Sequence, residues 1–142
     1  MTLSRRWQDK YASYQLTVHD KFIESLIIGA IGDDITARFR KDIHELALQY
    51  GGRPFGYFAD LSQSEGYTGI AEKEIIKAYQ ICLQCGCVID AMIVSSPLVK
   101  SQMQRVSDIL DIDIPLNVRL FDNRDDAVAF VEKIVDKQIA AL

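Results

Sequence analysis

The hydroxyl-bearing residues best suited to binding chemistry gather between positions 62 and 69, in the stretch Ser-Gln-Ser-Glu-Gly-Tyr-Thr-Gly. Ser62, Ser64 and Thr68 precede or open a predicted helix, where free N–H groups attract an anion or a phosphorylated side chain. Helix capping by Ser64 or Thr68 explains the same residues equally well. The sequence contains neither GxxxxGK[ST] nor GxGxxG, so no motif supports nucleotide binding.

A second candidate is the cysteine cluster formed by Cys82, Cys85 and Cys87. A CxxC pair can be a redox couple or half of a metal site. This one falls at the predicted end of a helix, where the helix dipole opposes a thiolate. Both histidines, His19 and His44, lie in other segments. We therefore expect buried thiols, no metal, no cofactor and no enzyme activity, with a cysteine-based redox or metal-binding protein as an alternative.

Composition narrows the class of protein. The chain has 142 residues, 49% hydrophobic and 25% charged, which suits one soluble domain. A net charge of −4 argues against nucleic-acid binding, which needs a clustered basic surface. No apolar run approaches the roughly 20 residues that span a bilayer, so no integral membrane segment is predicted. The N-terminus lacks a secretory signal, and an odd number of cysteines fits a reducing compartment, which predicts a cytoplasmic protein.

Alternating strand and helix patterns position these candidates. The chemistry-bearing stretch follows a buried strand over 55–61 and leads into a helix over 68–84, where open α/β sheets place their sites. Other strands are predicted over 14–18, 22–31, 87–94 and 117–121, and other helices over 33–50, about 97–110, and after Asn123. The order β-β-α-β-α-β-α-β-α predicts a single α/β domain. We expect a mostly parallel sheet with an antiparallel edge strand and helices packed on the sheet.

The first 13 residues are predicted to be an arm or a short helix preceding a domain over 14–142. Leu3, Trp7, Tyr11 and Tyr14 recur at the spacing of one helical face. This face could pack on its own domain or on a twin subunit. It could also dock on a partner or an anionic membrane. A homodimer through this segment or through an edge strand is expected on the same grounds.

Several short motifs resemble the SpoIIAA-like/STAS superfamily across residues 14–135. They are Gly32 after the second strand, Asp60-Leu61 ending the third strand, and Thr68-Gly69 opening the second helix. The closing stretch FDNRDDAVAFVEKIV is also similar to the family's last strand and helix. In anti-sigma-factor antagonists of this family, a partner kinase phosphorylates the serine before that glycine, which implies Thr68 as a possible phosphorylation site. Gly66-Tyr67 replaces the family's Asp-Ser here, so the chain looks more like the SpoIIAA-like branch than a classical antagonist.

The leading hypothesis is a non-enzymatic interaction or regulatory module that docks a protein partner. The residues expected to make this contact are Ser62, Ser64, Tyr67, Thr68 and Gly69. The broad fold also resembles the lipid-binding CRAL-TRIO type, which implies a domain that binds a small apolar or anionic ligand between helices and sheet. The aromatic residues that could line such a pocket are Tyr50, Phe55, Tyr57 and Phe58.

Overall fold

A five-stranded mixed sheet organises the fold, and the computed structural model describes residues 3–142 of the chain. The strands lie side by side in the order in which the chain makes them. They are β1 (Ser4–Gln8), β2 (Ala12–Val18), β3 (Phe22–Ile31), β4 (Phe55–Tyr67) and β5 (Cys87–Val94). β1, β2 and β3 pair antiparallel, whereas β3, β4 and β5 pair parallel. The parallel half requires helical crossovers, which α1 and α2 provide.

Five α-helices and two short 3-10 helices complete the described residues 3–142. The α-helices are α1 (Asp33–Ala47), α2 (Glu72–Gln84), α3 (Pro97–Ile109), α4 (Leu116–Arg119) and α5 (Arg124–Ala140). The 3-10 helices are η1 (Leu48–Tyr50) and η2 (Gly69–Ala71). Side-chain caps define where two helices begin. At the start of α3, Ser96 accepts a hydrogen bond from the Val99 N–H, and at the start of α5, Asn123 accepts one from the Asp126 N–H. Gly51, at φ 59°, ends the first helical segment in the left-handed conformation.

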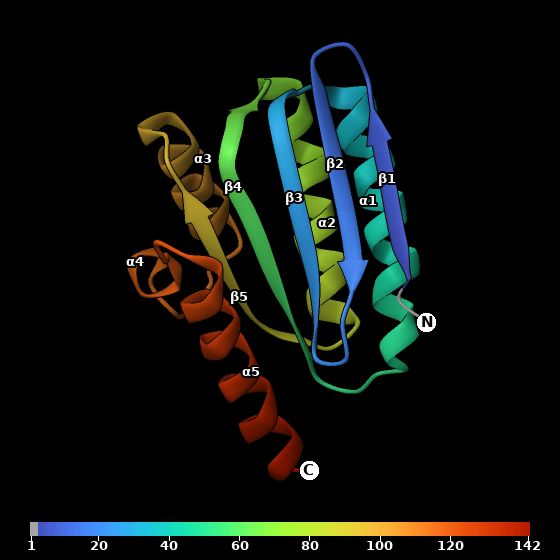
Figure 1. The fold of residues 1–142 in the computed structure, drawn as a ribbon, viewed down its shortest axis with the longest axis vertical. Helices are drawn as coiled ribbons and strands as arrows, with labels where there is room; N and C mark the ends of the chain where they lie inside the picture. Colours follow the sequence, from blue (N-terminus) through green and yellow to red (C-terminus); the bar gives the residue numbers. More distant parts are fainter. Residues whose placement is uncertain (1–2) are drawn as a thin grey trace.

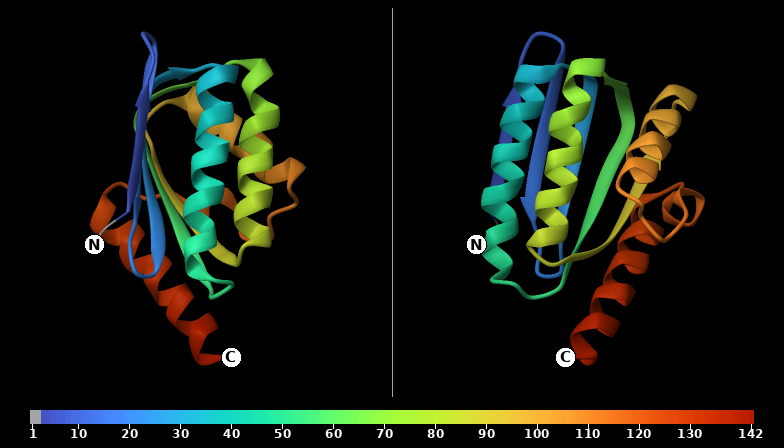
Figure 2. Two further views of the ribbon diagram at one scale, coloured as in Figure 1. Left: turned by 90° about the vertical axis from the view of Figure 1, so that its right-hand side faces the viewer. Right: turned by 180° about the vertical axis from the view of Figure 1, so that it is seen from behind.

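The helices cover the two faces of the sheet unequally (Figures 1 and 2). α1, α2 and α3 pack on one face through the larger core cluster, which includes Ile43, Tyr57 and Met103. α5 packs on the opposite face, over β4 and β5, through a smaller cluster. Phe58, Ala127 and Val131 are central members of that cluster, each with 0% exposure. The sheet thus has two apolar cores, one on each face.

The α/β class is confirmed, but the predicted sheet and strand order are partly wrong. The sheet has as many antiparallel as parallel strand pairs, so it is mixed rather than mostly parallel. Residues 4–8, predicted as an arm or short helix, form the edge strand β1. The strand predicted over 117–121 is wrong: residues 116–119 form α4, and Leu120, just after it, makes an isolated parallel bridge with Met92.

The predicted loop over 62–69 is largely strand. β4 continues to Tyr67, and its pairing with β3 shifts register twice, between Leu26 and Ile28 and again between Gly29 and Ala30. Each irregularity bends a strand and accommodates extra residues on it. This explains how 13 residues of β4 pair with the shorter β3, and why a hydroxyl-rich sequence remains in the sheet.

Candidate functional site

The predicted docking residues lie along the carboxyl end of β4, and most are tied to their own neighbours. The Ser62 hydroxyl donates to Asp60 Oδ1 over 2.6 Å, and Ser64 Oγ accepts the Gly66 N–H over 3.0 Å. The Tyr67 hydroxyl donates to Glu72 over 2.8 Å. Ser62, Ser64 and Tyr67 thus each make an internal hydrogen bond, and their contact with a partner stays a prediction.

A side-chain amide from α3 holds the backbone at this point. Gln102 Oε1 accepts the Tyr67 N–H over 3.1 Å, and Gln102 Nε2 donates to the Tyr67 carbonyl over 2.9 Å. Thr68 and Gly69 are exposed, and the neighbouring Ile70 side chain is 73% exposed. Thr68 caps η2 without a side-chain hydrogen bond. Within the predicted docking stretch over 62–69, the exposed residues are therefore Gln63, Glu65, Thr68 and Gly69.

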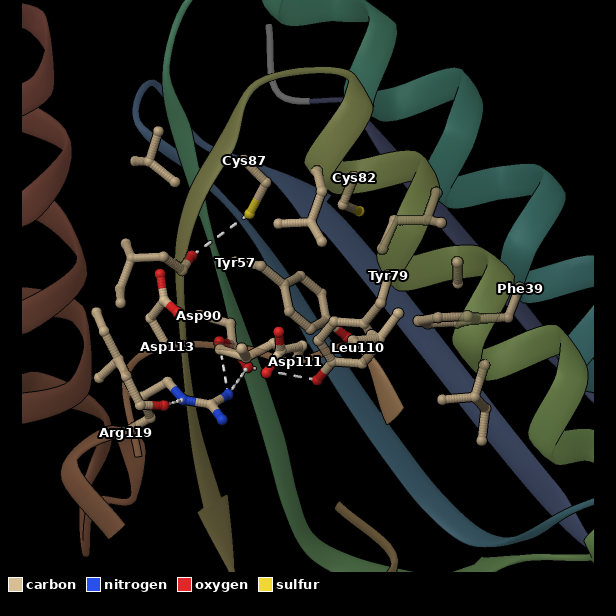
Figure 3. A pocket seen from close by; sticks show the side chains of 18 residues that line it. Phe39, Tyr57, Tyr79, Cys82, Cys87, Asp90, Leu110, Asp111, Asp113 and Arg119 are labelled. Atoms are coloured by element: carbon tan, nitrogen blue, oxygen red, sulfur yellow. Dashed lines mark hydrogen bonds and ion pairs between the residues drawn. The ribbon is translucent and has the colours of Figure 1, made fainter. Parts of the chain in front are cut away.

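An apolar cavity lies elsewhere, between α2, β5 and the segment over 110–114. Its volume is about 330 Å³, within the range of small-molecule sites. Apolar side chains form most of its wall, among them Phe39, Ile75, Ala78 and Leu110. In Figure 3, Phe39 of α1 and Tyr79 of α2 lie on one side of the cavity, and Asp90 and Arg119 lie on the other. This arrangement of an apolar body with few polar groups is typical of a ligand pocket.

A buried ion pair forms the polar wall of the cavity. Arg119 Nη1 donates to both carboxylate oxygens of Asp90, over 2.8 and 2.9 Å. Its Nη2 donates to Ser107 Oγ over 2.7 Å and its Nε to the Ile114 carbonyl over 3.0 Å. The Arg119 side chain is 1% exposed. This network joins β5, α3 and α4, and it leaves every nitrogen of the guanidinium with a partner.

The interior of the cavity is electrically neutral. Burial raises the pKa of Asp90, while Arg119 beside it opposes that rise and keeps the charges paired. Burial also raises the pKa of Tyr79 well above its ordinary value, so its phenol stays protonated. The Tyr79 hydroxyl is 3.4 Å from Asp90 Oδ2, the longest contact in the network. It is the polar group best placed to exchange its partner for a ligand.

The exposed lining residues locate the mouth of the cavity. Leu83, near the end of α2, is 49% exposed, and Asp111 and Asp113 on the opposite segment are exposed as well. Asp111 has a φ of 53°, the left-handed conformation that glycine usually supplies just after a helix. The mouth thus has an apolar rim on one side and two carboxylates on the other.

A smaller cavity of about 50 Å³ adjoins the first one. Phe39, Tyr57, Ile75 and Tyr79 line both cavities. Ser64, Gly66 and Tyr67 line only the smaller one, so the predicted docking segment reaches the apolar interior from its far end.

Of the four aromatic residues predicted to line a pocket, only Tyr57 does so in the main cavity. Phe55 and Phe58 are fully buried core residues with 0% exposure, and Phe58 belongs to the cluster under α5. Tyr50 stacks on Phe55 and donates its hydroxyl to the His19 carbonyl over 2.7 Å. Phe55 and Phe58 are therefore structural, whereas Tyr50 also lines a separate, more polar cavity of about 400 Å³.

The cysteines lie at the end of α2 and the start of β5, as the sequence indicates. All three are free thiols, and Cys82 and Cys87 line the cavity. Burial raises the pKa of Cys82 to about 12, which disfavours a reactive thiolate. Within residues 3–142, no group of three or more His, Cys, Asp or Glu side chains could hold a metal ion.

Sequence reasoning missed the cavity and its ion pair. A signal was present, since Asp90 interrupts the apolar strand CVIDAMIV, and a buried carboxylate requires a partner. Its partner Arg119 lay within a segment predicted as strand, so the pairing could not be anticipated.

Comparison with known proteins adds no identification, because the chain matches no family model and no curated protein. In the described part of the chain, no helix combines the length and apolar character needed to cross a membrane.

Proposed function

We propose that this protein binds a small, mostly apolar ligand in the cavity between α2, β5 and the 110–114 segment. The observation that supports this is the volume of about 330 Å³ behind a largely apolar wall. A concave, largely apolar pocket of this size is the usual form of a small-molecule site. A bound apolar molecule would bury this wall from water.

The polar framework around the cavity supports the same proposal. The Asp90–Arg119 pair and its bonds to Ser107 and Ile114 hold the wall in place without a ligand. Binding then costs little ordering of the protein, which favours affinity in a small site. The helix–sheet location also agrees with the expectation of a ligand between these layers.

A neutral hydrophobic fluorophore, N-phenyl-1-naphthylamine, tests the proposal. It should brighten and saturate on titration with the wild-type protein. Ala78 is 3% exposed on α2 and lines the cavity, so Ala78→Leu places three further carbons in it. We expect at least about tenfold weaker binding, since a lost apolar contact of this size is worth roughly 1.4 kcal/mol or more. Unchanged affinity in this variant would contradict the proposal.

Two further variants secure the interpretation. Leu83→Trp places a larger side chain at the mouth of the cavity and so narrows its entrance. Because Leu83 is exposed, this substitution should leave folding undisturbed. It should slow or weaken binding even if Ala78→Leu is too unstable to study. Ala129→Leu makes the same change on the exposed side of α5, away from the cavity, and should bind the fluorophore like wild type.

A second candidate is an interaction module of the SpoIIAA-like/STAS type. The exposed residues Thr68, Gly69 and Ile70 favour it, because an apolar side chain that is 73% exposed beside a free hydroxyl can contact a partner. Partner pull-down with Thr68→Glu and Ser64→Ala tests this candidate. Capture of the same partners by both variants and by wild type would count against it.

A further inference from the structure

We infer that the ligand of this cavity carries a positively charged amine at one end, so that the protein selects apolar amines over fatty acids of the same length. The inference rests on the proposed function and adds the chemical class of the ligand. It follows from which charges at the cavity are free and which are already paired.

The cavity has no cation free to receive a carboxylate. Arg119 is the one basic side chain among the residues that line it. Its Nε, Nη1 and Nη2 already donate to Ile114, Asp90 and Ser107, and the side chain is 1% exposed. A carboxylate ligand would have to displace Asp90 from a buried ion pair, which leaves a buried charge without a partner.

The free charges at the mouth are negative. Asp111 and Asp113 line the cavity, are exposed, and have no ion-pair partner among residues 3–142. With the Asp90–Arg119 pair neutral, the lining carries two uncompensated carboxylates. An ammonium group at the mouth is attracted to both, while a carboxylate is repelled by both.

The apolar wall suits the rest of such a molecule. Phe39, Tyr57 and Tyr79 provide aromatic surface, and Tyr57 and Tyr79 meet edge to face with ring centroids 6.1 Å apart. An alkyl or aryl chain can extend past these rings while its amine remains at the mouth. The Tyr79 hydroxyl can accept a hydrogen bond from an amine that enters further.

Three probes with one chain length separate the charge from the apolar body: decylamine, decanol and decanoic acid. Isothermal titration of the full chain at neutral pH and low salt should give the order decylamine, then decanol, then decanoate. We expect decylamine to bind about threefold to tenfold tighter than decanol, since a partly exposed charge pair contributes only a modest interaction free energy. Raising the salt concentration should reduce this ratio.

The double variant Asp111→Asn/Asp113→Asn should bring the decylamine-to-decanol ratio close to one and leave decanol binding unchanged. Asparagine tolerates the left-handed conformation, so the turn after α3 is kept. The control Asp122→Asn/Asp125→Asn removes two exposed carboxylates that do not line the cavity, and should retain the wild-type ratio.

The outcomes distinguish the two proposals. Decanol that binds as tightly as decylamine, or decanoate that binds most tightly, overturns the amine inference and leaves the apolar site in place. Absence of binding by all three probes overturns the proposed function itself. An equal loss of the ratio in the control variant would assign the preference to net charge and also contradict a specific amine site.

Discussion

Arg119 Nη1 lies 2.8 Å from Asp90 Oδ1 and 2.9 Å from Oδ2, in the wall of an apolar cavity. The two residues come from α4 and β5, and both are buried. Their pairing holds the 110–114 segment against the sheet, because Arg119 also binds the Ile114 carbonyl. The cavity therefore depends on an ion pair whose two members have no other charged partner within residues 3–142.

Breaking this pair should destabilise the protein strongly. Arg119→Met leaves the Asp90 carboxylate buried and unpaired, which costs about 3–5 kcal/mol of unfolding free energy. Urea denaturation at neutral pH measures the loss. The double variant Asp90→Leu/Arg119→Met removes both charges and should recover much of the stability. A double variant as unstable as the sum of the two single changes would show that the residues act independently.

Close packing between β4 and α5 predicts that a substitution on one element can offset the loss of stability caused by a substitution on the other. A Cβ added to Gly56 would collide with the Val131 side chain. Gly56→Ala should therefore lower the unfolding free energy by about 1–3 kcal/mol. Gly56→Ala/Val131→Ala should lose less than the sum of its single variants, as judged by thermal denaturation. Gly69→Ala serves as control, because nothing lies within 4 Å of a Cβ there, and it should change stability little.

An ion pair between β3 and α5 should make stability depend on pH. Arg124 donates to both oxygens of Glu24 over 2.8 Å, and this hydrogen bonding lowers the Glu24 pKa. A folded-state pKa below the unfolded value stabilises the protein above the ordinary value of 4.5. That contribution is lost as the pH falls through the lowered folded-state pKa.

Arg124→Gln should thus cost about 0.5–1 kcal/mol at neutral pH. The difference from wild type should shrink below about pH 4.5 as Glu24 becomes protonated. Thermal denaturation across this pH range measures it. Lys133→Gln, which removes an exposed charge from the same helix, corrects for net charge. A difference that stays constant from neutral to acidic pH would contradict the assignment.

The cavity thiols should react slowly. Cys82 is 5% exposed, and burial raises its pKa to about 12. Iodoacetamide at neutral pH should leave Cys82 unmodified in the folded protein while free cysteine is consumed, because the thiolate is the reacting form. Peptide mass spectrometry identifies the labelled sites, and labelling in urea shows that all three cysteines are otherwise accessible. Labelling of Cys82 at the rate of free cysteine would contradict this prediction and support the alternative of a cysteine-based redox protein.

The sequence predicted elements well where local signals agreed. The apolar run in Phe22–Ile31 predicted the full extent of β3, and the glycines at 51, 52 and 86 all have positive φ at segment ends. Ser96 and Asn123, polar residues directly before the predicted helices, cap α3 and α5. Each of these features is decided by residues close in sequence.

The predictions failed where contacts between residues far apart in the sequence determine the structure. The helical spacing of Leu3, Trp7 and Tyr11 coexists with a strand, because residues 4–8 gain hydrogen bonds by pairing with β2. Trp7 then stacks on Arg38 of α1, with 3.6 Å from the guanidinium carbon to the ring centroid. Asp90 and Arg119 are 29 residues apart, so the cavity wall could not be assembled from spacing alone.

Chemical-shift mapping tests the central claim, that the cavity between α2, β5 and the 110–114 segment binds an apolar ligand. A ¹H–¹⁵N correlation spectrum titrated with decanol should show saturable shifts at Tyr79, Cys82, Asp90 and Leu110, all of which line the cavity. The exposed residues Thr68 and Ile70 should not shift. Shifts confined to residues 68–70, or no saturable shift at any cavity residue, would contradict the account.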